Sequence, residues 1–413
     1  MDSRQAVGWL HRRAGFGLHP DALDAAVERG PDAELARLLA PPEPGTDPWA
    51  GLELDPMDGG RIEAIVGWLA RMITTTAPYS DRRTWNLHGW LVSSMEKVNQ
   101  PILMVEQIRM FMERGGGPVP DLLRALTADR AMLVYLDGRT STGDAPNENY
   151  GRELLELFAL GVGNYTEDDV LAAARALTGW VANPRGDGSV FVGFRHDDTP
   201  QTLLGVTGVH DLDTVIDAVV ADPAHPRFVA ERVAQMYLGD LSDALLADVV
   251  DDLAATYVAG GMELDAVIAR ALRLGLDGAT TPVVAAPIPW LVTCMRACGV
   301  PYQRALRSAR NGLGEMGQVP LVPPSVAGWP TGTEWFTSSS LVARTNVAAA
   351  VAGETAADQP VMIAAGDDDL DRLAQHLALP EPFSAATTAA IRSAPDPTAR
   401  LALALVCPEN LLS

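Results

Sequence analysis

The stretch from Ala145 to Trp180 constrains the fold most strongly, because it carries two helix patterns joined by a glycine-rich turn. At 100° per residue, the first helix has an apolar side and an opposite arc of polar and charged residues. That arc holds Glu148, Asn149, Arg152, Glu153 and Glu156. One side of this helix therefore packs into a core, and the other presents a row of charge.

The second helix follows a short turn. Gly161 and Gly163 can adopt the positive φ values that often end a helix, and Thr166 with Asp169 forms the pattern of a capping box. We therefore predict that the second helix spans Glu167 to Thr178 and meets the first at a corner lined by carboxylates.

Helical periodicity also dominates the rest of the chain, and no long run of residues alternates as an extended strand would. A short hairpin arm at residues 189–194 is the β-structure that the pattern supports. We predict a mainly α fold, in one large multi-helix domain with long irregular loops and at most a minor β hairpin. Within it we expect an N-terminal helical lobe (1–75), a core (76–210), a second helical lobe with a tryptophan-rich loop (211–346) and alanine-rich C-terminal helices (347–413).

Composition excludes several classes of function. The 31 Lys and Arg residues against 53 Asp and Glu give a formal net charge of −22, which opposes binding to the phosphate backbone of nucleic acids. Three cysteines are too few for a disulfide framework. Neither an export signal nor an apolar run of membrane-spanning length is visible. We therefore expect a cytoplasmic protein without a membrane span.

Two further motifs could wall a binding site. The motif HRRAGFG places His11, Arg12 and Arg13 before a tight bend. Such a cluster could hold an anion or pair with the excess acid, and we favour pairing because exposed charges commonly pair.

The long irregular segment VPPSVAGWPTGTEWF carries Trp329 and Trp335 beside Pro and Gly, and these rings could form the wall of a pocket.

Two histidines are candidate functional residues. His88 lies on a largely apolar stripe, where a histidine is more often a core residue than a ligand. His196, Asp197 and Asp198 form a loop cluster that suits proton transfer or metal binding as well as it suits a simple turn.

Together these motifs resemble the bacterial DUF1800 family of unknown function. The resemblance rests on HRRAGFG, WNLHGWLVSSMEKV, APNENYGRELLELFALGVGNYTEDDV, ARALTGW, RHDDTPQTLLG and VPPSVAGWP, which follow in this order from about His11 to Asn346. The family is named for the absence of a known activity. Its members are often encoded beside a second uncharacterised family that is similar to alkaline phosphatases and sulfatases, which makes such a protein a candidate partner.

The resemblance also implies a shared site. The residues that match the family pattern are His88, Asn147, Glu148, Arg152, Glu153, Glu156, Arg175, His196 and Asp197. The family's usual His-x-His pair keeps His88 but has Trp90 at its second position, and Phe158 stands where many members have histidine. A metal bound by those histidines would lack up to two ligands in this chain.

The leading hypothesis is an enzyme that performs acid/base chemistry, such as hydrolysis, on an anionic small molecule or saccharide. Glu148, Glu153, His88 and His196 are its candidate acids and bases. The same four residues are the candidate ligands of a divalent or transition metal, which would make a metal-dependent oxidation the second reaction class. The candidate substrate-binding residues are Arg152, Arg175, Asn147, Asp197 and Trp329.

The alternative hypothesis is structural. Glu148 and Arg152 can form an ordinary i,i+4 ion pair, and Glu153 and Glu156 can form a solvated face. The protein would then be a non-catalytic helical scaffold that docks a partner, such as a phosphatase- or sulfatase-like protein, through its tryptophan-bearing loop. Catalysis requires His88 and Glu148 to be reachable from solvent, whereas a scaffold allows them to be sealed and paired.

Overall fold

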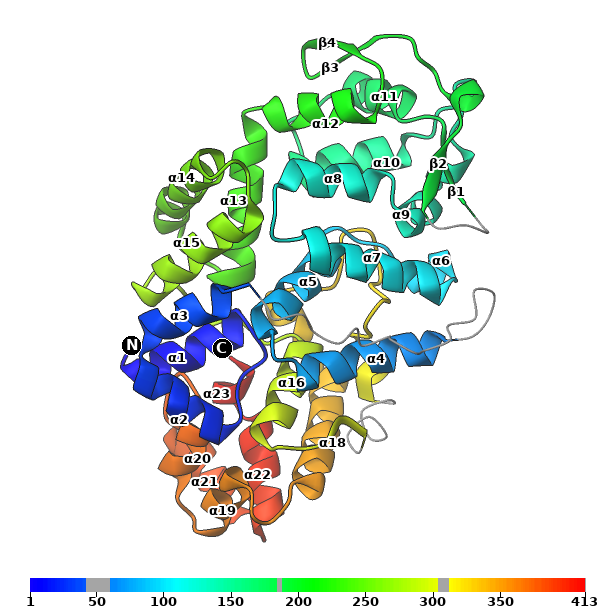
Figure 1. Ribbon diagram of the computed structural model, residues 1–413. Coiled ribbons are helices and arrows are strands. Elements are labelled where there is room, and N and C mark those ends of the chain that lie inside the picture. The colour runs from blue at the N-terminus through cyan, green and yellow to red at the C-terminus, as the bar shows by residue number, and fades with distance from the viewer. Residues whose placement is uncertain (42–59, 184–187, 304–311, 413) are drawn as a thin grey trace.

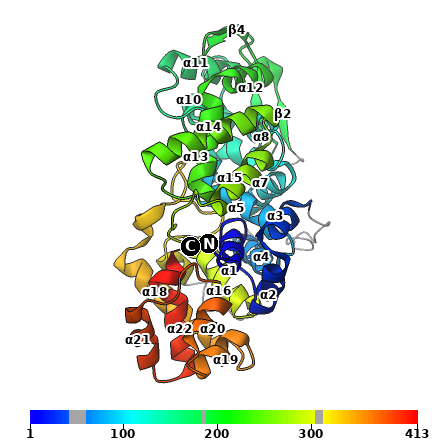
Figure 2. The same ribbon diagram turned by 90° about the vertical axis from the view of Figure 1, so that its left-hand side faces the viewer.

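The leucine- and alanine-rich periodicity of the chain builds a stack of helices around one continuous apolar core. A computed structural model describes residues 1–41, 60–183, 188–303 and 312–412. The buried cluster draws side chains from nearly the whole of these ranges, from Trp9 in the first helix to Leu411 in the last. The predicted mainly helical fold is confirmed, and Figure 2 shows the stack from its side, with α11 at one end and α19 at the other.

Helices from the two ends of the sequence lie side by side in the lower part of the molecule (Figure 1). The first group comprises α1 (Ser3–Arg13), α2 (Pro20–Arg29) and α3 (Pro31–Leu39). The last group comprises α18 (Ser338–Glu354), α19 (Pro360–Gly366), α20 (Leu370–His376), α21 (Ala385–Ser393), α22 (Pro397–Val406) and α23 (Pro408–Leu411).

The middle of the stack is formed by α5 (Pro78–Trp90) and its neighbours (Figure 1). They are α4 (Arg61–Thr74), α6 (Met95–Val98), α7 (Pro101–Arg114) and α16 (Pro287–Ala297). Three helices flank α5 on one side, namely α13 (Ala224–Tyr237), α14 (Asp243–Ala259) and α15 (Leu264–Leu276). A 3-10 turn, η4 (Gly332–Trp335), follows the tryptophan-bearing segment.

The upper end holds the region around Ala145 to Trp180 (Figure 1). Its helical elements are α8 (Val119–Thr127), α9 (Arg130–Tyr135), η1 (Gly138–Thr140), α10 (Glu148–Glu153), η2 (Leu154–Ala159), α11 (Glu167–Ala176), η3 (Gly193–Arg195) and α12 (Leu212–Ala221). The first predicted helix continues from α10 into η2, which is a π-helix. The predicted capping box of Thr166 and Asp169 is confirmed, as is the positive φ of Gly161 and Gly163.

Two small antiparallel sheets complete the upper end. Strand β1 (Trp180–Ala182) pairs with β2 (Ser189–Phe191), which confirms the expected hairpin arm. A second pair, β3 (Gln201–Leu203) with β4 (Val206–Val209), was not predicted. Strands this short cannot show a clear alternation of apolar and polar residues. No helix within the described ranges is long and apolar enough to cross a bilayer.

Candidate functional site

The predicted charged arc lies on the surface of the upper end. Arg152 donates from Nη2 to Glu167 Oε2 at 2.7 Å and to Glu148 Oε2 at 3.3 Å. Both glutamates are exposed, and the hydrogen bonds with Glu167 raise the pKa of Arg152. Glu153 is half-buried, and burial together with the charge of Glu156 raises its pKa. At this exposed corner the arc is therefore tied mainly to α11, through the two hydrogen bonds from Arg152 to Glu167.

A second group of predicted residues surrounds Thr178. The ring nitrogen Nδ1 of His196 lies 3.0 Å from the Thr178 carbonyl and donates to it. Asp197 accepts from the Thr199 backbone at 3.1 Å, and the Thr199 hydrogen bonds hold its pKa below the ordinary value. Arg175 Nη1 lies 3.4 Å from Asp197 Oδ2. These contacts tie the loop to the end of α11.

Asn147 has a local role that the sequence pattern did not single out. Its side-chain oxygen accepts from the Asn149 backbone at 2.8 Å, so Asn147 is the N-cap of α10. Its side-chain nitrogen donates to the Asp137 carbonyl at 3.3 Å. It thereby fixes the start of the helix that carries the charged arc.

His88 and Trp329 lie elsewhere, on and beside α5 in the middle of the stack. His88 is completely buried, and its ring stands edge-on to Trp68 and Trp329, with centroids 5.2 Å and 5.3 Å away. Neither ring nitrogen has a hydrogen-bond partner among the described residues, and burial lowers the pKa of His88 to about 3. His88 is a neutral aromatic core residue, sealed from solvent as the structural alternative allows.

The structure thus places the predicted site residues in separate groups, with α5 in the middle and α10 and α11 at the upper end (Figure 1). The four candidate metal ligands, His88, Glu148, Glu153 and His196, do not form one cluster. Across the part of the chain that the structure describes, no three His, Cys, Asp or Glu side chains are grouped as a metal ion would require. Catalytic roles for these residues stay a prediction.

A cleft with a volume of about 800 Å³ opens beside α5. Its walls come from α1, α5, α13, α16, the segment 282–286 and the tryptophan-bearing loop. Four arginines line it, namely Arg12, Arg13, Arg82 and Arg232. Five tryptophans line it as well, namely Trp85, Trp90, Trp290, Trp329 and Trp335. The expectation that Trp329 and Trp335 wall a pocket is confirmed.

The arginines of the cleft are held mainly by backbone oxygens and aromatic rings. Arg12, which is 7% exposed, donates to the carbonyls of Leu377 and Ala378 and to the side-chain oxygen of Asn410, at 2.6–3.1 Å. Arg13, which is 2% exposed, donates to the Thr281 carbonyl at 2.5 Å. We expected the charged residues of HRRAGFG to pair with acidic side chains. This expectation is correct for His11, which contacts Glu34 at 2.8 Å, and wrong for Arg12.

The other two arginines of the cleft come from α5 and α13. Arg82 donates to the Gly15 carbonyl at 3.4 Å and lies over the Phe16 ring, and burial lowers its pKa to about 10. Arg232 lies over the Phe228 ring at 5.2 Å, and burial lowers its pKa as well. Within the described residues, neither forms an ion pair with a carboxylate. Both stay protonated at neutral pH, so among the described residues the cleft holds two cations without a carboxylate in ion-pair contact.

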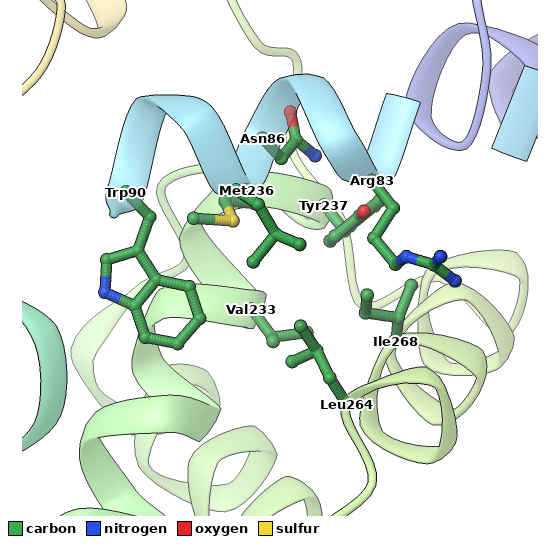
Figure 3. Close-up of a pocket in the computed structure, with 9 residues that line it drawn as sticks. Arg83, Asn86, Trp90, Val233, Met236, Tyr237, Leu264 and Ile268 are labelled. Atoms are coloured by element: carbon green, nitrogen blue, oxygen red, sulfur yellow. The ribbon is translucent and has the colours of Figure 1, made fainter. Parts of the chain in front are cut away.

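A small interior pocket of about 10 Å³ adjoins the cleft and shares Asn86, Trp90 and Met236 with it. Figure 3 shows α5 above the helices of the pocket floor, with Trp90 at one end and Arg83 and Tyr237 at the other. Its volume suits about one water molecule. Burial raises the pKa of Tyr237 to about 12, so the hydroxyl stays protonated at neutral pH.

The cleft brings together motifs from opposite ends of the sequence. HRRAGFG supplies Arg12 and Arg13, and VPPSVAGWP supplies Trp329. A sequence model described as a protein of unknown function (DUF1800) matches residues 9–412. The chain belongs to the DUF1800 family. No curated protein and no solved structure matches it, so the chemistry of this DUF1800 protein must be argued from its own residues.

Sequence reasoning missed four charged residues of the cleft, namely Arg82, Arg232, Asp240 and Glu334. Arg82 lies about one helical turn before Trp85, the first residue of the motif that contains His88, and this spacing is a signal that could have been read. Arg232 lies in an ordinary amphipathic pattern, and nothing in that pattern marks it. Asp240 and Glu334 are the carboxylates among the described lining residues, and both are exposed.

Proposed function

We propose that this protein binds an anionic small molecule or saccharide in the arginine–tryptophan cleft and acts on it by acid/base chemistry. The observation that carries the proposal is the presence of Arg82 and Arg232 in the cleft without a carboxylate partner in the described structure. The chain has 53 acidic residues available for pairing. A charge taken out of water is costly unless it is compensated, and a bound anion would compensate these two.

The neighbouring groups fit the same ligand. Guanidinium groups bind carboxylate, sulfate and phosphate through two parallel hydrogen bonds. Flat indole rings offer apolar surface beside the cations. Most ligand pockets combine such apolar walls with a few convergent polar groups, and about 800 Å³ falls in their usual size range.

We assign the acid/base step to the two carboxylates of the cleft, Asp240 and Glu334. Both line the cleft and are exposed to solvent, so each can exchange protons with water and with a bound ligand. Glu334 accepts from the Thr331 backbone at 3.2 Å, which fixes it on the tryptophan-bearing loop. Asp240 and Glu334 thereby take the role that the sequence analysis gave to Glu148, Glu153, His88 and His196.

The scaffold alternative is less well supported, because the tryptophans of its docking loop turn inward. Trp335 is 4% exposed, and Trp329 stacks on Trp85 inside the cleft. A partner protein would have to bind elsewhere on the surface.

The test is calorimetric titration with sulfate, phosphate, citrate and glucuronate at low ionic strength. We expect at least one of these anions to bind the wild type, and Arg82→Gln and Arg232→Gln each to weaken binding by about tenfold or more, the value of a charge-assisted hydrogen bond. The matched control is Arg227→Gln, because Arg227 lies on the same helix as Arg232 but pairs with Asp251 on the surface. Equal binding by all variants, or none by the wild type, would contradict the proposal.

The acid/base step has its own test. Asp240→Asn and Glu334→Gln should leave binding nearly unchanged and abolish conversion of any ligand that the wild type converts, as followed by mass spectrometry. If the wild type binds anions but converts none of them, the proposed binding function stands and the proposed catalytic step is wrong.

A further inference from the structure

We propose that the ligand of the cleft is an acidic oligosaccharide, a carbohydrate chain with negative groups on more than one sugar residue. The inference rests on the proposed anion site and deepens it by naming the ligand class. Three features of the cleft carry it: a fixed indole platform, two cations that come from different helices, and a set of small hydrogen-bonding groups.

The platform is Trp329. One face of its ring stacks on Trp85, with centroids 5.0 Å apart and 13° between the ring planes, and its ring meets His88 at 5.3 Å in an edge-on arrangement. The ring is only half-buried and lines the cleft. Its orientation is therefore fixed before any ligand arrives. Indole rings pack well against the C–H-rich faces of sugar rings, because the negative ring face attracts weakly positive C–H groups.

The cations lie toward opposite ends of α5. Arg82 is near the start of the helix, where Tyr237 is close enough to influence its pKa. Trp90 is the last residue of the helix and contacts Phe228, with centroids 6.2 Å apart, and Arg232 lies over that same Phe228 ring. Figure 3 agrees, with Tyr237 far from Trp90 along the pocket.

A chain that carries negative groups on successive or alternate units can contact both Arg82 and Arg232, which approach the cleft from two helices, and its neutral part can then pack against Trp329. Thr293, Gln235, Asn86, Thr331 and Thr333 also line the cleft. Their hydroxyl and amide groups both donate and accept hydrogen bonds, as sugar hydroxyls require.

Titration calorimetry with defined probes tests the inference. The acidic probes are tetragalacturonate and a chondroitin sulfate tetrasaccharide, and the comparison probes are galacturonate, neutral cellotetraose and the oligonucleotide dT4. We expect one acidic tetrasaccharide to bind at least about tenfold more tightly than galacturonate or cellotetraose, the ratio that one additional charged contact supplies. Arg82→Gln and Arg232→Gln should each remove that advantage.

Trp329→Leu tests the contribution of the indole platform separately from that of the arginines. It should weaken tetrasaccharide binding by a larger factor than galacturonate binding, with Trp329→Phe as a milder variant if the leucine variant does not fold by circular dichroism. Tetrasaccharides that bind no better than galacturonate would overturn the inference while the anion site stands. Tighter binding of dT4 would replace the saccharide with a nucleic acid. If none of the anionic probes binds, both the inference and the proposed function are wrong.

Discussion

The indole ring of Trp329 lies nearly parallel to that of Trp85, with 5.0 Å between the ring centroids. Trp85 belongs to α5, and Trp329 comes from the loop before η4. The backbone reinforces this contact next to the rings. Gly328 has φ of 91°, and a β-carbon added there would lie 2.5 Å from the Gly89 carbonyl oxygen. The loop reaches α5 only because residue 328 has no side chain.

Gly328→Ala should therefore displace the loop. We expect a loss of roughly 2 kcal/mol or more in the free energy of unfolding, from the left-handed backbone conformation together with the clash, and weaker binding of any cleft ligand. Chemical denaturation measures the first effect. The control is Gly353→Ala, since the exposed Gly353 lies inside α18 with nothing near its added β-carbon; that change should be neutral or slightly stabilising. Equal free energies of unfolding for Gly328→Ala and Gly353→Ala would argue against the close approach of Gly328 to the Gly89 carbonyl oxygen.

Burial of neutral His88 should make stability depend on pH. Its folded-state pKa of about 3 lies below the ordinary 6.5, so the unfolded chain takes up the proton first as the pH falls. The stability that neutral His88 contributes is complete above pH 6.5 and is lost as the pH falls toward 3. Between pH 7 and 5 the wild type should lose about 2 kcal/mol through this one residue.

The variant His88→Phe keeps an aromatic ring and removes the titration. Its free energy of unfolding, measured by urea denaturation, should fall less between pH 7 and 5 than that of the wild type. His210→Gln serves as the control because His210 is exposed. The same pH slope in His88→Phe and the wild type would show that His88 is not buried as described.

The buried carboxylate of Glu34 is the centre of an ion cluster that joins α1, α2 and α3, in which Arg29 and Arg37 are exposed. The carboxylate, which is 0% exposed, accepts from His11 at 2.8 Å, Arg29 at 2.8 Å and Arg37 at 2.6 Å. Burial raises its pKa, but these hydrogen bonds outweigh burial and leave the pKa below the ordinary value. Its contribution to stability is therefore present at neutral pH and disappears as the pH falls below about 4.

Glu34→Gln should lower the free energy of unfolding by roughly 2 kcal/mol at pH 7, because the buried His11 ring and the two exposed arginines lose their charged hydrogen-bond acceptor. Asp24→Asn is the matched control, since Asp24 pairs with Arg4 at the surface and such pairs contribute less than about 1 kcal/mol. Thermal and urea unfolding measure both. A loss no larger than that of the control would show that the cluster is solvated.

The sequence supports prediction of the helices better than prediction of the site. The capping box at Thr166 and the glycine stops at Gly161 and Gly163 depend on residues close in sequence, and the structure has them as predicted. The π-helix after Glu153 has no comparable local signal. It depends on how Leu154 and Phe158 pack in the core.

The cleft depends on contacts between residues far apart in the sequence. Arg12 and Trp329 were each noticed as members of unusual motifs, but only the packing of α1, α5 and the late loop brings them to one cavity. The charged arc of Glu148 and Arg152 was the more conspicuous pattern because its residues are adjacent on one helix. Periodicity cannot distinguish an exposed ion pair of that kind from a functional group.

The central claim is that the arginine–tryptophan cleft binds anions, and X-ray diffraction tests it most directly. Crystals grown without sulfate or phosphate would be soaked in selenate and measured at the selenium absorption edge. The account predicts an anomalous peak in the cleft within hydrogen-bond distance of Arg82 or Arg232, and no such peak in the Arg82→Gln, Arg232→Gln double variant. Selenate bound only at the outer surface, or at the cleft in both proteins alike, would contradict it.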